Sequence, residues 1–206
     1  MLKIWGRSSS SNVAKVCWAC GEMGLAFERY DVGGDFGGND TPEYLAMNPN
    51  GRVPTIDDDG FVLWESNAIV RYLARKHDQG GLCPSEPRAY ADADRWMDWQ
   101  QTTLGPAFSP FFRQMVMTPP AERRQSVMDA SVKETAQVLG ILERHLQTRD
   151  YMLGDRLTMA DIPLCAVIYR WFEMDIDRPA LPAVEAYYRR LAARKPFQDY
   201  VTLMRK

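Results

Sequence analysis

The spacing of apolar residues divides the chain into two halves of different kinds. In the first half, Leu2 to Trp5 alternates like a short strand, and apolar residues from Val13 to Leu25 follow at helical spacing. A second strand is expected from Phe27 to Val32, and the loop Gly33 to Asp40 leads from it into a short helix near Pro42. This order predicts a βαβ unit, in which the two strands run parallel.

Two further apolar runs indicate a hairpin. Val53 to Ile56 and Phe61 to Trp64 flank Asp57-Asp58-Asp59-Gly60, a sequence that favours a tight turn between antiparallel strands. Ser66 then precedes a helical pattern and is expected to cap it. The order β-α-β-α-β-β-α over residues 1–77 therefore predicts a mixed four-stranded sheet packed between helices.

Strand signals are lost in the second half. Residues 78–87 contain two adjacent glycines and two prolines and interrupt all periodicity, so we expect a linker there. Residues 88–206 show amphipathic helical patterns and predict an all-helical bundle. Its expected helices, separated by prolines and a glycine, cover 88–104, 107–117, 120–146, 158–174 and 181–194.

Composition narrows the class of protein. A length of 206 residues with 46% hydrophobic residues suits two globular domains, and a net charge of -2 argues against a nucleic-acid partner. No apolar run approaches the roughly 20 residues that cross a bilayer. The chain opens directly into a predicted strand, so no signal peptide is expected. Four cysteines are too few for a disulfide scaffold, and we expect a cytoplasmic protein with reduced thiols.

Candidate chemistry begins where the first strand meets the first helix. Ser10, Ser11 and Asn12 lie at the predicted start of that helix, where unpaired amides and the helix dipole favour an anion. A hydroxyl or amide at this place can donate a hydrogen bond to a thiolate. Taken alone, the motif is better explained by ordinary helix capping.

Two other segments complete a pattern. Val53, before Pro54, can offer its backbone groups to an extended peptide, and Arg52 can bind a carboxylate. Ser66 lies at a second helix start, which suits a carboxylate, and Glu65 suits an ammonium group. Each feature singly has an ordinary structural explanation. Together they describe a ligand with a γ-glutamyl end, a thiol and a glycyl carboxylate, which is glutathione.

The chain resembles the glutathione transferase superfamily, in its serine-type branch (theta-, phi- or beta-like). The resemblance is carried by Ser10 with Lys15-Val16, by Asn48 to Ile56, by Leu63 to Ile69 and by Gly154 to Asp161. It implies a thioredoxin-like fold for residues 1–77, a cis proline at position 54, and a capping box that braces a helix in the second half. It also implies a homodimer that acts in detoxification.

The resemblance also implies roles for individual residues. Ser10 would contact the glutathione sulfur, with Ser11 or Asn12 as alternatives because four serines adjoin. The glutathione-binding set implied in this way is Asn39, Arg52, Val53, Pro54, Glu65 and Ser66. Aromatic residues of the second half would form the electrophile pocket, namely Phe108, Phe111, Phe112 and Trp171.

These residues predict an enzyme that activates glutathione as a thiolate for attack on a small apolar electrophile, with glutathione as co-substrate and without a metal. The two alternatives are a glutathione-dependent disulfide reductase and a non-catalytic ligand-binding or docking protein. Cys17 and Cys20 have the spacing of a redox pair, but they fall inside the predicted helix on buried positions, so we interpret them as core residues.

Overall fold

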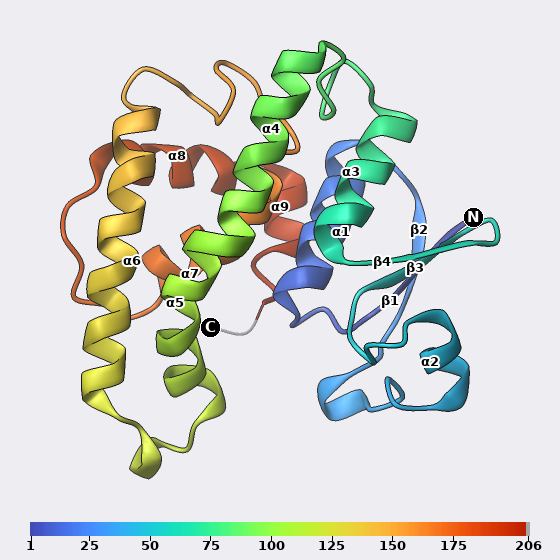
Figure 1. Cartoon of the computed structure of the whole chain (residues 1–206), viewed down its shortest axis with the longest axis horizontal. Helices are drawn as coiled ribbons and strands as arrows, with labels where there is room; N and C mark the ends of the chain where they lie inside the picture. Colours follow the sequence, from blue (N-terminus) through green and yellow to red (C-terminus); the bar gives the residue numbers. More distant parts are fainter. Residues whose placement is uncertain (205–206) are drawn as a thin grey trace. The chain divides into compact units, whose positions relative to one another are not determined.

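The computed structural model describes residues 1–204, which form two compact units. The first unit comprises Met1–Ser85 together with the described residues from Lys195 onward, and the second comprises Glu86–Arg194. Figure 1 shows strands only in the first of these units and helices in both. The mixed α/β first half and the all-helical second half predicted from the sequence are confirmed.

The first unit is built on a four-stranded mixed sheet in the order β2-β1-β3-β4. The central strand β1 (Leu2–Trp5) pairs in parallel with β2 (Phe27–Tyr30) and antiparallel with β3 (Thr55–Asp58). Strand β4 (Phe61–Trp64) completes the hairpin with β3, so the predicted mixed sheet is confirmed. Burial alternates from residue to residue along β1 and β2, so successive side chains of these two strands face opposite sides of the sheet.

Within residues 1–204, four α-helices belong to the first unit. They are α1 (Ser11–Glu22), α2 (Pro42–Met47), α3 (Ser66–His77) and α9 (Lys195–Tyr200), with a 3₁₀ turn, η1, at Gly34–Phe36. Helix α1 contacts both α3 and α9. The sequence did not predict α9, and the structure places it with the first unit, whereas the expected second domain extended over 88–206.

The second unit begins with a long helical stretch whose hydrogen-bonding pattern changes along its length. Helix α4 (Pro87–Trp99) runs into a π turn, η2 (Gln100–Leu104), then into α5 (Gly105–Phe112) and a second π turn, η3 (Arg113–Met117). The prediction that a proline at position 106 separates two helices is wrong, because the residues on either side keep helical backbone angles.

A side chain from a neighbouring helix bridges a gap in the backbone hydrogen bonding of α5. The N–H of Phe111 donates to the Ser131 hydroxyl at 3.1 Å, and that hydroxyl in turn donates to the carbonyl of Ala107. Ser131 therefore stands between two backbone groups that an uninterrupted helix would join directly. This insertion, next to Pro110 inside α5, lets the helix pass through a proline-rich sequence.

The remaining helices of the second unit follow a 3₁₀ turn, η4 (Pro120–Glu122). They are α6 (Gln125–Leu146), α7 (Cys165–Glu173) and α8 (Pro182–Ala192), with a 3₁₀ turn, η5 (Ile162–Leu164), leading into α7. Helix α6 packs against α5 and α8. The helices expected at 120–146 and 158–174 thus begin several residues later than predicted.

The predicted capping box in front of α7 is confirmed. One carboxylate oxygen of Asp161 accepts the N–H of Thr158 at 2.8 Å and its hydroxyl at 3.2 Å. The other oxygen accepts the N–H of Met152 and the hydroxyl of Tyr187, both at 2.9 Å. Asp161 is fully buried, and these four donors tie the start of α7 to the preceding loop and to α8.

Candidate functional site

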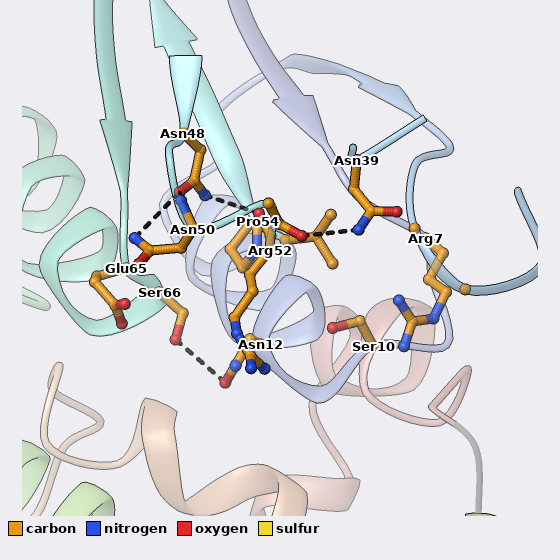
Figure 2. Close-up of a pocket in the computed structure, with 14 residues that line it drawn as sticks. Arg7, Ser10, Asn12, Asn39, Asn48, Asn50, Arg52, Pro54, Glu65 and Ser66 are labelled. Carbon is orange, nitrogen blue, oxygen red and sulfur yellow. Dashed lines mark hydrogen bonds between the residues drawn. The ribbon is translucent and has the colours of Figure 1, made fainter. Parts of the chain in front are cut away.

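One pocket of about 470 Å³ in the first unit collects most of the residues singled out from the sequence. Figure 2 shows Glu65 and Ser66 at one side, Asn39 and Arg7 at the other, and Arg52 and Pro54 between them. The volume falls in the range of about 300–1,000 Å³ that is usual for small-molecule sites. The predicted residues that line it are Ser10, Asn12, Asn39, Arg52, Val53, Pro54, Glu65 and Ser66.

Of the three candidates for the sulfur contact, the structure brings two to the pocket. Ser10 is the N-cap residue of α1, yet its side chain makes no capping hydrogen bond. Asn12 also lines the pocket, whereas Ser11, the first residue of α1, is not among the lining residues in the described part of the chain. The simple capping role that the sequence allowed for Ser10 is therefore not observed.

The starts of two helices meet at the pocket. The Ser66 hydroxyl donates to the side-chain oxygen of Asn12 at 3.3 Å, which joins the first turn of α3 to the first turn of α1. Both starts present unpaired backbone amides and the positive ends of helix dipoles. The pocket is therefore suited to anionic groups.

Glu65, and not Ser66 as expected, occupies the N-cap position of α3. Its backbone has φ 71° and ψ 109°, a conformation that non-glycine residues rarely adopt. The Glu65 side chain is exposed and does not cap the helix. This geometry leaves its carboxylate available to a positively charged group in the pocket.

The segment before β3 offers an open backbone edge. The Val53–Pro54 peptide bond is cis, as the resemblance implied. The carbonyl of Arg52 accepts hydrogen bonds from the Tyr44 hydroxyl at 2.7 Å and from the Asn48 amide at 2.8 Å. Within the described chain, the N–H and C=O of Val53 make no hydrogen bond. A peptide lying along this edge would satisfy both groups.

Asn39 has a structural task beside any contact with a ligand. Its amide N–H donates to the carbonyl of Gly51 at 2.8 Å and so fixes the turn that precedes Arg52. Asn39 also lines the pocket. Asn39 therefore positions the turn, and its direct contact with glutathione stays a prediction.

Sequence reasoning missed several residues that line the pocket. Asn48 is buried, with 2% of its surface exposed, and it holds Arg52 through the carbonyl just described. It directly precedes Pro49-Asn50-Gly51, a sequence typical of a turn, and this was a signal in the sequence. The other lining residues not predicted are Arg7, Gly33, Gly34, Asn50 and Gly51.

The four aromatic residues expected to hold the electrophile have different surroundings in the second unit. Trp171 is fully buried, and Phe108 and Phe111 are buried with their ring centroids 5.6 Å apart. Phe112 is partly exposed, and the Arg170 guanidinium lies over its ring at 4.0 Å. Phe111 also lines a separate cavity of about 580 Å³ within this unit.

The cysteine pair of α1 is buried in the core of the first unit. Burial raises the pKa of the Cys17 thiol to about 12, and burial also raises the pKa of Cys20. Thiols in such surroundings are poor nucleophiles, because the thiolate is the reactive form. Cys17 and Cys20 therefore behave as apolar core residues.

Among residues 1–204 there is no cluster of three or more His, Cys, Asp or Glu side chains placed to hold a metal ion. In the same part of the chain, every helix is too short or too polar to cross a membrane.

The chain matches two family models that together span most of its length. Residues 1–75 match the glutathione S-transferase N-terminal domain, and residues 100–195 match the glutathione S-transferase C-terminal domain. The glutathione S-transferase GstB of Escherichia coli K12 is 38% identical over 98% of this chain and 99% of its own. Glutathione S-transferase 3 of Zea mays is 33% identical over 97% of this chain and 93% of its own.

Solved structures give the same result. The theta-class glutathione S-transferase of Xanthomonas axonopodis pv. citri, crystallised with glutathione bound, is 47% identical and superposes with a TM-score of 0.93 over 97% of this chain and 96% of its own. Glutathione transferase F7 of Populus trichocarpa is 26% identical, with a TM-score of 0.89 over the full length of both chains. With both family models matched and full-length relatives above 30% identity, the chain belongs to the glutathione S-transferase family.

Proposed function

We propose that this glutathione S-transferase binds glutathione in the pocket of its first unit and holds the sulfur as a thiolate at the start of α1. The observation that carries the proposal is the Ser10 hydroxyl, which lines the pocket at a helix N-terminus and is not used for capping. The relative from Xanthomonas axonopodis pv. citri, at 47% identity, was crystallised with glutathione bound.

Each end of glutathione has a matching group in the pocket. The γ-glutamyl carboxylate would bind the Ser66 hydroxyl and the amides that begin α3, with Glu65 facing the ammonium group. The cysteinyl backbone would pair with the open N–H and C=O of Val53. Arg52 would face the glycyl carboxylate, near Asn39.

The chemistry follows from stabilisation of the anion. A cysteine thiol has a pKa of about 8.5, so only a few per cent is ionised near neutral pH. A hydrogen bond from Ser10 and the dipole of α1 favour the thiolate, and the thiol proton is released to solvent. The sulfur then attacks the electrophilic carbon, a carbon–sulfur bond forms, and the leaving group departs with the bonding electron pair. No covalent bond to the enzyme is required.

The second substrate belongs to the helical unit. We propose a small apolar electrophile held by aromatic side chains. Phe112 is the first choice because it is partly exposed, and the other candidates, which are buried, are Phe108, Phe111 and Trp171. We further propose that the protein works in the cytoplasm as a homodimer and serves in detoxification. Size-exclusion chromatography with light scattering would test the homodimer directly.

The test is a titration of the thiolate absorption band with glutathione at several pH values, combined with turnover of an aryl halide. A band that appears well below the pKa of free glutathione supports the proposal. If glutathione binds without the band and without turnover, the result would favour the alternative of a non-catalytic ligand-binding or docking protein. Turnover of a mixed disulfide without conjugation of the aryl halide would favour a disulfide reductase.

Substitutions assign the sulfur contact. Ser10→Ala should raise the pKa of bound glutathione by about one to two units, since a hydrogen bond to a charged group contributes about 1.5–3 kcal/mol. Its affinity for S-methylglutathione, which has no ionisable sulfur, should stay near the wild-type value. Asn12→Ala and Ser11→Ala are the matched controls. If either of these raises the pKa while Ser10→Ala does not, the sulfur contact moves to that residue.

A further inference from the structure

Arg7 reaches the same pocket from the loop between β1 and α1. Its backbone is fixed at both ends, because its N–H donates to the carbonyl of Val32 and its carbonyl accepts the N–H of Ser10, each at 3.1 Å. Arg7 and Ser10 are thus the two ends of a single turn. Figure 2 shows the guanidinium of Arg7 beside Ser10.

Two glycines make room for the Arg7 side chain. A Cβ at Gly34 would lie 2.9 Å from Nε of Arg7, and a Cβ at Gly33 would lie 3.2 Å from Nη1. Both distances are shorter than ordinary van der Waals contacts. Both glycines also have positive φ values, 82° at Gly33 and 61° at Gly34, that disfavour any other residue. The loop after β2 is therefore shaped to receive this arginine.

The guanidinium has no counter-ion in the part of the chain that the structure describes, where it forms neither an ion pair nor a hydrogen bond. Nearby Arg29 is different, since it donates to the carbonyl of Gly6 at 2.8 Å and pairs with Asp31. A partly buried cation without a partner, lining a pocket, is suited to an anion that arrives with the ligand.

Counting charges indicates which anion this is, and the count rests on the proposed function. The charged side chains that line the pocket are Arg7, Arg52 and Glu65. Glutathione as the thiolate carries one ammonium group, two carboxylates and the sulfur anion. Glu65 serves the ammonium, Arg52 the glycyl carboxylate, and the start of α3 the γ-glutamyl carboxylate. One cation, Arg7, and one anion, the sulfur, are left.

We propose that Arg7 is a second electrostatic partner of the glutathione sulfur, acting together with Ser10 to hold it as the thiolate. An opposite charge within about 4–6 Å lowers the pKa of an acid by about one to three units. The turn that joins Arg7 to Ser10 would keep hydroxyl and guanidinium in one rigid arrangement around the sulfur. The two glycines would keep the long side chain from folding away into solvent.

The experiment measures two ligands with wild type, two variants of Arg7 and one control variant. Wild type, Arg7→Gln and Arg7→Lys are titrated with glutathione, following the thiolate band across pH, and with S-methylglutathione by calorimetry. Arg7→Gln should raise the pKa of bound glutathione by about one unit or more, while Arg7→Lys, which keeps the charge, stays close to wild type. Affinity for S-methylglutathione, which has both carboxylates and no thiolate, should remain within about twofold of wild type. Arg52→Gln is the matched control and should weaken both ligands.

The outcomes separate this inference from the proposed function. If wild type shows no thiolate band, the proposed function fails and the inference fails with it. If wild type shows the band and Arg7→Gln leaves the pKa unchanged, only the role of Arg7 is overturned. Equal weakening of both ligands by Arg7→Gln, with an unchanged pKa, would assign Arg7 to a carboxylate. A lower melting temperature alone, with unchanged titration, would assign it to folding.

Discussion

Glu65, which lines the pocket, has a strained backbone. Its left-handed φ of 71° comes between the end of β4 and the start of α3, where the chain must turn sharply. Conformations of this kind cost about 1–3 kcal/mol for residues with a side chain. The fold accepts that cost at the position where a carboxylate would meet the ligand's ammonium group.

Glu65→Gly should therefore separate stability from binding. Glycine adopts a positive φ without strain, but it loses more backbone conformational entropy on folding than glutamate does. We therefore expect a net stabilisation of the folded state of about 1 kcal/mol. Glutathione affinity should fall because the carboxylate is lost. Urea unfolding measures the first effect and calorimetry the second.

Glu65→Gln serves as the matched variant, since it keeps the strained backbone and removes only the charge. Its stability should stay near wild type while its affinity falls. If Glu65→Gly also leaves the stability unchanged, the backbone at this position carries no strain.

At the scale of secondary-structure elements, α9 packs against α1 through a glycine. A Cβ at Gly21 would lie 2.8 Å from both Pro196 and Tyr200. Gly140, in α6, is a helical glycine with open surroundings, where a Cβ would meet only the tip of Arg144 at 3.8 Å. The two positions share a helical environment and differ in contact.

Alanine at the two positions should act in opposite directions. Gly140→Ala should stabilise the protein by about 1 kcal/mol, which is the helix propensity gained. Gly21→Ala gains the same propensity but crowds α9, and overpacking costs about 1–3 kcal/mol, so a net loss is expected. Thermal unfolding of the two variants checks this, and equal stabilisation of both would mean that α9 is not held against Gly21.

The capping box before α7 gives a pH dependence. Burial raises the pKa of Asp161 to about 6, above the value of about 3.9 for an unfolded chain. The folded state therefore holds this proton more tightly. The resulting stability is fully present below about pH 4 and is lost as the pH rises through about 6. The expected loss is about 3 kcal/mol.

Urea unfolding of wild type and Asp161→Asn from pH 4 to pH 7 tests this. The difference in unfolding free energy between the two proteins should decline with rising pH by roughly the amount given above. The asparagine variant is less stable at every pH because it cannot accept four hydrogen bonds, so the slope is the readout. Parallel curves would show that the four donors cancel the effect of burial.

The sequence predicted most elements because their apolar spacing is regular. The hairpin of β3 and β4 and the amphipathic faces of α3 and α6 need only local periodicity. The sequence wrongly predicted a break between helices at Pro106. The π turn before this proline and the insertion of Ser131 keep the chain helical, and both depend on tertiary packing, which local periodicity does not show. Six residues of α9 carry too little periodicity to show which unit they join.

The sequence predicted some residues of the candidate site and missed others. Motifs with fixed spacing, such as the segment around Pro54, gave several of the lining residues directly. Arg7 was missed because an arginine after a strand is usually solvated. Only the close approach of its side chain to Gly33 and Gly34 distinguishes it. Ser66 was expected to cap α3, but the strained Glu65 takes that place, and strain has no local signature in sequence.

For the whole molecule, the first unit is discontinuous in sequence. Phe197 of α9 is fully buried and meets Trp18 of α1 edge to face, with ring centroids 5.2 Å apart. Phe197→Ala should cost about 3–5 kcal/mol, the usual range for a buried phenylalanine. Hydrogen exchange should show α1 losing protection, and glutathione affinity should fall with it because α1 begins at the pocket.

Leu203→Ala is the control, since that side chain is 54% exposed and should change stability by less than about 0.5 kcal/mol. If Phe197→Ala leaves the protection of α1 unchanged, the first unit does not depend on α9.

The return of α9 also bears on how the protein is made. A ribosome delivers residues in order, and domains generally fold as they emerge. Here Trp18 leaves the ribosome early, but the phenylalanine that covers it follows only after all of Glu86–Arg194 has been synthesised. The sheet and α1 must therefore wait with an uncovered tryptophan while the helical unit is made, so the part that begins first is completed last.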